Sequence, residues 1–393
     1  MNSGSDSVFM GYTRADGSVG IRNHLLVLPS VVCANDTAAR IALQLNGAVY
    51  VTHQHGCAQL PSDAAQTKRT LAGFGANPNV AACIVVGLGC ETIQAREVAE
   101  EISKITTKPV AHLVIQEEGG TLATTAKGVR IGREMLAEIS LLHREEQPLS
   151  KLILGLECGG SDAWSGLSAN PAVGNASDRL IRAGGTSILS ETQEMIGAEH
   201  LLAKRAVNPE VAERLFSVVR HAEEGALADG VDIRLANPTP GNRQGGLTTL
   251  EEKSLGCISK AGTEAPLQEI LAFAEHPSRH GLIFMDTPGH DIESITGMVA
   301  GGAQVILFTT GRGTCTGCPI APVIKVCSNT PTFERMSDNM DVDAGPVIAG
   351  TKTIDDIGKA LFEEMLRVCS GKSTKSEDLG YGSFAINRIG PTQ

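Results

Sequence analysis

Short, continuous apolar runs alternate with amphipathic segments along the first half of the chain. The apolar runs predict strands at His24–Ser30, Val49–Thr52, Cys83–Val86 and Val110–Ile115. The segments between them predict helices near Asn35–Leu45, Asp63–Gly73, Thr92–Ile105 and Thr121–Leu142. Continuous apolar strands separated by helices are typical of a parallel sheet covered on both faces.

The same alternation continues in the second half of the chain. Strands are predicted at Lys151–Leu156, Thr186–Leu189, Gly281–Met285, Gln304–Phe308 and Pro322–Val326, and helices at Ala176–Ala183, Pro209–Glu224, Ile292–Val299 and Ile354–Cys369. The stretch Asp232–Gly262 is rich in asparagine, proline and glycine, so we predict a long ordered loop there, of the kind that usually carries function.

The charged, proline-containing segment Arg144–Ser150 indicates a boundary between two domains, residues 1–148 and 149–393. We therefore expect an α/β fold of two Rossmann-like domains with mainly parallel sheets. In such folds the active site lies at the carboxyl ends of the strands, and we expect it between the domains.

Composition narrows the class of protein. A chain of 393 residues is too long for one small core. Because 42% of the residues are hydrophobic and 20% are charged, the composition is that of a well-packed globular enzyme rather than of a disordered chain. Aromatic residues make up only 3%, with Trp164 as the single tryptophan, and the net charge of −11 argues against nucleic-acid and anionic-membrane partners. A local arginine cluster can still bind a small anionic substrate.

Localisation and assembly are inferred from the same data. The N-terminus shows no basic segment followed by an apolar run, and no apolar stretch approaches the roughly 20 residues of a membrane span, so we expect a cytoplasmic enzyme. The ten cysteines are then mostly thiols or metal ligands rather than disulfides. A homo-oligomer, in the first instance a homodimer, is expected for an enzyme of this size.

Three of the predicted strands each lead to a glycine-flanked cysteine, namely Cys57, Cys90 and Cys158. A cysteine on a glycine turn at the end of a strand lies where open α/β sheets place their active sites, and the glycine leaves room around the thiolate. Three such thiols favour one metal ion or an iron–sulfur cluster with an open iron. Each of them alone is as readily a small buried apolar residue.

Polar loops follow the other predicted strands. Arg312 lies between Gly311 and Gly313, where a guanidinium and bare backbone N–H groups suit a carboxylate. His53 and His55 alternate on one extended segment, so both side chains point to one face, as metal ligands or general bases. The remaining candidates are Ser161, Asp162, Asn170, Asn242, Lys253, Asp286 and His290. No glycine-rich nucleotide motif stands between a strand and a helix, so nucleotide binding has no support.

Taken together, these stretches resemble the altronate/galactarate dehydratase family over nearly the whole chain. The motifs that carry the resemblance are GYTRADGSVGIRN (11–23), HGC (55–57), GLGCE (87–91), ECGGSDAWSGLSANPAVGNASDRLI (157–181), SETQEMIGAEHLL (190–202), PTPGNRQGGLTTLEEKSLG (238–256), GLIFMDTPGHD (281–291), TTGRGT (309–314) and DVDAG (341–345). Runs of this length do not match by chance. Cys315 departs from the family pattern, so the resemblance supports no role for it.

The resemblance implies loss of water from a sugar acid, a hexarate or hexonate, to give a 2-keto-3-deoxy acid. It also implies iron, as Fe²⁺ or a three-cysteine iron–sulfur cluster, or another divalent metal. We assign Cys57, Cys90 and Cys158 as its ligands. A metal that chelates the carboxylate and a hydroxyl would stabilise the charge that develops when the proton on C2 is removed.

The dehydration reaction that the resemblance implies also needs groups that bind the substrate carboxylate and groups that transfer the proton. Arg312 and the backbone of its two glycine neighbours would anchor a carboxylate, and His55 or His290, with Asp286, would transfer the proton. The residues expected to bind the rest of the substrate are Ser161, Asp162, Asn170, Asn242 and Lys253.

Alternatives remain open at this stage. Full-length family members carry a further small N-terminal domain of the antifreeze-like (SAF) type, which this sequence does not show, so a separate small SAF subunit is an expected partner. Two-subunit sulfolactate sulfo-lyases of the same superfamily are built in this way, and release of sulfite is therefore the alternative to release of water. A non-catalytic scaffold subunit and a zinc-dependent hydrolase are the further alternatives.

Overall fold

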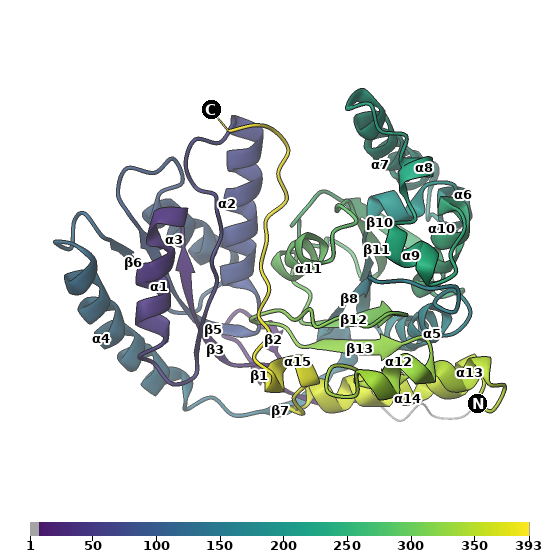
Figure 1. Cartoon of the computed structure of the whole chain (residues 1–393). Helices are drawn as coiled ribbons and strands as arrows, with labels where there is room; N and C mark the ends of the chain where they lie inside the picture. Colours follow the sequence, from purple (N-terminus) through teal and green to yellow (C-terminus); the bar gives the residue numbers. More distant parts are fainter. Residues whose placement is uncertain (1–7, 393) are drawn as a thin grey trace.

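The computed structural model describes residues 8–392, in which two α/β lobes stand side by side (Figure 1). The expectation that the chain has no leader segment falls partly on residues 1–7, outside the described part. In the first lobe four parallel strands pair in the order β4-β3-β5-β6. Their bounds are β3 (His24–Pro29), β4 (Ala48–Tyr50), β5 (Val80–Gly87) and β6 (Val110–Val114).

Both faces of this sheet are apolar and covered by helices. The helices are α1 (Asn35–Ala42), α2 (Pro61–Ala76), α3 (Ala95–Ile105) and α4 (Thr121–Ile139). Because successive residues of a strand point to opposite faces, Leu25 and Val27 of β3 pack with α1 and α4, while Leu26 and Leu28 pack with α2 and α3. The predicted parallel sheet covered on both faces is therefore confirmed.

The second lobe contains a seven-stranded parallel sheet in the order β10-β11-β9-β8-β12-β13-β14. The strands are β8 (Ile153–Cys158), β9 (Thr186–Leu189), β10 (Leu267–Leu271), β11 (Gly281–Met285), β12 (Val305–Thr310), β13 (Val323–Cys327) and β14 (Val342–Asp343). The helices around it include α5 (Ala169–Arg182), α6 (Glu199–Ala203), α7 (Pro209–Ala228), α11 (Asp291–Ala300), α12 (Thr330–Arg335) and α14 (Ile354–Cys369). The α/β prediction of two mainly parallel sheets is confirmed. Within residues 8–392, no helix combines the length and apolar character that a membrane crossing requires.

The apolar core is continuous between the two lobes. Helices α5, α7 and α14 cover one face of the seven-stranded sheet, and α11 covers the other face together with α2 of the first lobe. A Cβ atom at Gly73 of α2 would lie only 2.3 Å from the carbonyl oxygen of Ala300 in α11. The two helices therefore meet backbone to backbone at this glycine, and Figure 1 shows them next to each other.

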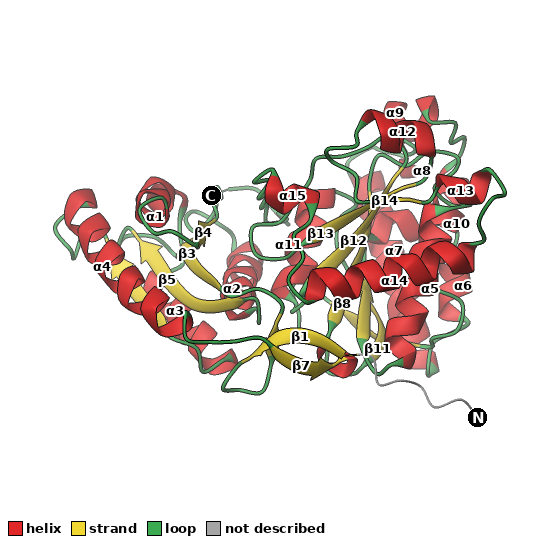
Figure 2. Cartoon of the chain, turned by 90° about the horizontal axis from the view of Figure 1, so that it is seen from below, coloured by secondary structure: helices red, strands yellow, loops and turns green. Residues whose placement is uncertain are grey.

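The segment predicted to be a boundary is a strand. Glu145–Pro148 forms β7, which pairs antiparallel with β1 (Val8–Thr13), and β1 pairs with β2 (Val19–Gly20). Figure 2 shows this ribbon beside both larger sheets. Three of the four side chains of β7 are exposed, so backbone pairing rather than an apolar pattern defines this strand, which explains why the sequence did not indicate it.

The predicted long loop over Asp232–Gly262 is wrong, because this stretch is mostly helical. It contains α8 (Ile233–Ala236), α9 (Pro240–Gln244) and α10 (Leu250–Ile258). The polar residues that suggested a loop are helix caps: Asp232, Thr239 and Thr249 each accept a hydrogen bond from a backbone N–H of the first turn. The side chains of Asp and Thr accept hydrogen bonds from the free N–H groups at the start of a helix. Because the same side chains also bond to nearby backbone groups in turns, these residue types are common in loops as well.

The C-terminal segment, residues 381–392, returns to the first lobe and runs along α2 (Figure 1). The backbone N–H groups of Ile389 and Gly390 donate to the two carboxylate oxygens of Asp63, each at 2.8 Å. The rings of Phe384 and Phe74 meet edge to face with centroids 4.8 Å apart. The last residues of the predicted second domain therefore pack on the first.

Candidate functional site

The candidate site lies at the carboxyl end of β8 in the second lobe. β8 is the first strand of its sheet in the sequence, and its neighbours β9 and β12 lie on opposite sides of it. Open α/β sheets bind ligands at such a point, because the loops that leave neighbouring strands diverge there and form a crevice.

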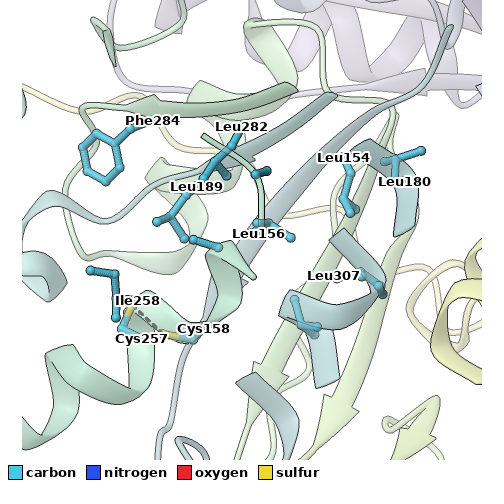
Figure 3. Close-up of a cluster of buried hydrophobic side chains, with 14 of the residues drawn as sticks. Leu154, Leu156, Cys158, Leu180, Leu189, Cys257, Ile258, Leu282, Phe284 and Leu307 are labelled. Atoms are coloured by element: carbon cyan, nitrogen blue, oxygen red, sulfur yellow. Dashed lines mark hydrogen bonds between the residues drawn. The ribbon is translucent and has the colours of Figure 1, made fainter. Parts of the chain in front are cut away.

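Three buried side chains meet at this strand end. The sulfur of Cys158, the last residue of β8, lies 3.6 Å from the sulfur of Cys257 in α10 and 3.5 Å from Oε1 of Glu191, which follows β9. All three ligand atoms lie within 4.8 Å of one another, and within residues 8–392 no other three histidine, cysteine or acidic residues come so close. Figure 3 shows the two sulfur atoms side by side near Ile258, at one end of the apolar cluster.

Glu191 is held in an uncommon backbone conformation. Its φ angle is +68°, in the left-handed region that non-glycine residues rarely occupy. The backbone N–H of Glu191 donates to Oγ1 of Thr287 at 2.8 Å, and the backbone N–H of Cys158 donates to Oε2 of Glu191 at 3.0 Å. Strain of this kind costs of order 1–3 kcal/mol and is concentrated at functional sites.

Charge is unbalanced around this group. Lys260, fully buried, forms an ion pair with Glu191, while Glu157, also fully buried, has an oxygen without a hydrogen-bond partner. Burial, followed by the charge of Glu191, raises the pKa of Glu157. A hydrogen bond with Cys257, followed by burial, raises the pKa of the Cys158 thiol. Burial would lower the pKa of Lys260, but the thiols and carboxylates around it raise it above its usual value.

The donor set fits a divalent transition metal. Two thiols and a carboxylate are ligands that Fe²⁺ and Zn²⁺ accept, and a cation would replace the thiol protons and balance the excess of acidic groups. The partnerless oxygen of Glu157 next to Cys158 supports the same conclusion. Cys158, Glu191 and Cys257 are thus the residues that could hold a metal.

The structure does not bring the three predicted cysteine ligands together. Cys57 and Cys90 are exposed and belong to the first lobe, and only Cys158 is part of the buried group. In the turn that contains Cys90 the buried polar residue is Glu91, whose Oε1 accepts from Ser30 Oγ at 3.2 Å. The sequence does show that Glu191 follows a predicted strand, at the edge of the sheet. No motif or spacing in it indicates that Cys257 approaches Cys158.

Four of the eight predicted substrate residues line a pocket of about 520 Å³ beside this group. Its lining includes Cys158, Ser161, Asp162, Asn170, Lys253 and Cys257. Lys253 Nζ donates to Glu194 Oε1 at 2.8 Å, and although burial disfavours the ammonium form, Glu194 raises the pKa of Lys253. Asn242 supports the pocket from outside, because its amide donates to the carbonyl oxygen of Ser161 at 3.0 Å.

The loop with Gly311, Arg312 and Gly313 leads to a second pocket. This pocket measures about 670 Å³ and is lined by Gly311 and Arg312, whereas Gly313 does not line it. Asp162 lines both pockets, so the two adjoin at this residue.

The predicted proton-transfer residues lie in two places, His55 in the first lobe and Asp286 with His290 in the loop between β11 and α11. His55 lies in the first lobe, where its Nε2 is 3.1 Å from the carbonyl oxygen of Ile386. His290 is exposed, with Nδ1 3.8 Å from Glu293 Oε1, and Asp286 accepts a hydrogen bond from Thr192 at 2.6 Å. Their catalytic roles stay predictions. Asp291 ends the motif GLIFMDTPGHD (281–291), but the sequence alone assigns it no role. Its carboxylate lies against Gly159, where a Cβ atom would be 2.3 Å from Asp291 Oδ2.

His53, beside His55, is held as a neutral imidazole. Its Nε2 lies 2.8 Å from the carbonyl oxygen of Pro29, and its Nδ1 accepts from the backbone N–H of His55 at 3.2 Å, which assigns the proton to Nε2. Burial lowers the pKa of His53 from 6.5 to about 4. Protonation of Nδ1 would therefore lose an acceptor and place a charge in an apolar site.

We expect this histidine to destabilise the fold in acid. Between pH 6.5 and 4 the unfolded chain binds a proton that the folded chain does not, so stability falls as pH falls, by up to roughly 1.4 kcal/mol per pH unit. Urea unfolding followed by circular dichroism from pH 7 to 4 measures this slope. His53→Gln keeps a hydrogen-bond donor and an acceptor but cannot titrate, so it should reduce the slope of stability against pH. His143→Gln, at an exposed position, serves as the control and should leave the slope unchanged. Equal slopes in His53→Gln and the unaltered chain would contradict the assignment.

Comparison with known proteins agrees with this architecture. The profile of the D-galactarate/altronate dehydratase C-terminal family matches residues 149–392, and that of the D-galactarate dehydratase/altronate hydrolase second domain matches residues 11–140. The (2R)-sulfolactate sulfo-lyase subunit beta of Chromohalobacter salexigens is 39% identical over 382 residues, which cover 97% of both chains.

Two dehydratases are similar over nearly all of this chain. The altronate dehydratase of Bacillus subtilis is 34% identical over 400 residues, covering 99% of this chain and 79% of its own length. The galactarate dehydratase (L-threo-forming) of Escherichia coli is 38% identical over 389 residues, covering 94% and 74%. The chain therefore belongs to the D-galactarate/altronate dehydratase family, whose named dehydratases are hydro-lyases.

Proposed function

We propose that this chain is a metal-dependent lyase that removes water from a sugar acid, a hexarate or hexonate, and forms a 2-keto-3-deoxy acid. The observation that carries the proposal is the buried group of Cys158, Glu191 and Cys257. Its two thiols line the pocket that four of the predicted polar residues also line. A metal held by these three side chains would act as a Lewis acid on the substrate carboxylate and hydroxyl.

Two charged side chains near the buried group, Asp291 and Lys253, suit the remaining steps. The reaction removes the proton from C2 and hydroxide from C3, and the enol that forms then tautomerises to the ketone. In this proposal Asp291 accepts the C2 proton. Burial, followed by the charge of Glu191, raises the pKa of Asp291 to about 6, and a general base works best when its pKa lies near the pH of the reaction. Lys253, protonated beside Glu194, offers a positive charge to the substrate carboxylate.

A second candidate is the release of sulfite from sulfolactate. The similarity to the sulfo-lyase subunit beta, which extends over 97% of both chains, favours it. The early chemistry is the same, since a proton is removed next to a carboxylate and a group then leaves from C3. A protein named subunit beta is one part of an assembly, so in this case we propose a small second subunit as partner.

The substrate is decided by measuring the product. We expect the purified chain, supplied with Fe²⁺ under anaerobic conditions, to convert galactarate or altronate into a keto acid, detected as its semicarbazone. (2R)-Sulfolactate, assayed in parallel for sulfite, should give none. Sulfite from sulfolactate with no keto acid from either sugar acid would establish the second candidate instead. If none of the three acids turns over, alone or with a small SAF subunit added, both candidates are wrong.

A further inference from the structure

The second pocket, which adjoins the first at Asp162, is the more positively charged of the two. Two arginines, Arg312 and Arg335, and one carboxylate, Asp162, line it. In the first pocket the charged residues are Asp162, Glu251, Glu252 and Lys253, so carboxylates predominate there. An anionic group of a ligand that spans both pockets is therefore attracted to the second.

No acidic side chain of the described residues pairs with either arginine. Arg312 Nη2 donates to the amide oxygen of Gln244 at 3.3 Å, and Arg335 Nη2 donates to Oγ1 of Thr332 at 3.1 Å. Among residues 8–392, no ion pair includes either of them. Both guanidinium groups thus keep most of their donors free for a ligand.

The carboxylate of Asp162 is engaged by other groups. Its Oδ1 accepts from the hydroxyls of Ser165 and Ser328, each at 2.8 Å, and its Oδ2 accepts from the amide of Asn329 at 2.9 Å. These bonds fix the loop after β8 to the start of α12. Asp162 consequently shapes the wall between the pockets and leaves the arginines without an acidic partner.

We propose that Arg312 and Arg335 together bind a second anionic group of the substrate, so that the preferred substrate is an acid with two anionic groups. This inference rests on the proposed function and narrows it, because a hexarate has such a group at its far end and a hexonate does not. A guanidinium pairs with a carboxylate or a sulfonate through two parallel hydrogen bonds. The shared chemistry is an oxyanion, and its source is either the distal carboxylate of a hexarate or the sulfonate of a sulfo acid.

Trp164 provides a local probe of this pocket. It is the single tryptophan of the chain, it lines the pocket, and its side chain is 45% exposed. We expect galactarate to change its fluorescence saturably. Arg335→Gln should weaken the apparent affinity about tenfold or more, because it removes charge-assisted hydrogen bonds to the second anionic group. The affinity for altronate should not depend on Arg335. Arg130→Gln, on the surface of α4 in the first lobe, serves as the matched control.

Steady-state kinetics separates this proposal from the proposed function. Arg335→Gln should raise KM for galactarate with little effect on kcat, and Arg335→Lys should recover part of the loss. If galactarate binds in an Arg335-dependent manner but no acid turns over, the proposed function fails and the anion pocket stands. If the chain turns galactarate over while Arg335→Gln changes neither KM nor the titration, the anion pocket is wrong. An Arg335 effect on sulfolactate alone identifies the sulfonate as the source.

Discussion

Replacing Cys257 by serine is expected to release the bound metal and to lower kcat/KM by more than roughly a hundredfold. Changes to residues that only support a metal ligand already cost about 10–100-fold in affinity or activity, and Cys257 is placed to be a ligand itself, with its sulfur 3.6 Å from that of Cys158. Cys158→Ser should have the same effect. Metal content per chain, measured by mass spectrometry on anaerobically purified protein, reports the loss independently of activity.

Three further serine substitutions make this experiment decisive. Cys57→Ser and Cys90→Ser should retain the metal, because both thiols are exposed and lie in the first lobe. Cys369→Ser, a thiol buried in the core of the second lobe, controls for the cost of burying a hydroxyl. Loss of metal in Cys57→Ser or Cys90→Ser, with full retention in Cys257→Ser, would establish the three-cysteine set suggested by the sequence. Acid-labile sulfide accompanying iron would identify a cluster.

Substituting Lys260 by methionine is expected to lower the free energy of unfolding by about 3–5 kcal/mol, the usual cost of removing one partner from a buried ion pair. Lys260 is fully buried and forms an ion pair with Glu191, and the charge of Glu157 also acts on it. The variant would therefore leave the buried Glu191 without its ion-pair partner. Urea unfolding followed through Trp164 fluorescence reports on the second lobe, which contains both residues.

A surface ion pair of the same lobe provides the control. Lys372 pairs with Glu364 at the protein surface, and Lys372→Met should change the free energy of unfolding by no more than about 0.5 kcal/mol. If Lys260→Met unfolds at the same urea concentration as the unaltered chain, the carboxylates beside it are already protonated, and the charged description of the site is incorrect.

Much of the fold follows from the apolar pattern because buried parallel strands are apolar on both faces. The strands Thr186–Leu189 and Gly281–Met285 and the helix Ile354–Cys369 have the predicted bounds. The pattern fails at strands whose pairing leaves the side chains in solvent, such as β7, and at helix caps, whose residue types also occur in loops. Local polarity alone cannot separate these cases.

The site could be predicted only in part, for a related reason. Cys158 ends a strand and Ser161 follows it closely, so the apolar run that predicts the strand also places both residues at the sheet edge. Cys257 lies 99 residues beyond Cys158, on a helix within the stretch interpreted as a loop. Its approach to Cys158 depends on how α10 packs against the sheet, which no spacing in the sequence encodes.

The return of residues 381–392 to α2 has a consequence for how the chain is made. Domains generally fold from the N-terminus during synthesis, at about 5–20 residues per second. Roughly 310 residues are translated between Phe74 and its partner Phe384. At that rate about 15–60 s pass between the synthesis of α2 and the synthesis of Phe384, whose ring packs against Phe74. During that interval Phe74 lacks the ring that covers it, and a chain truncated before Phe384 would leave this part of the first lobe uncovered.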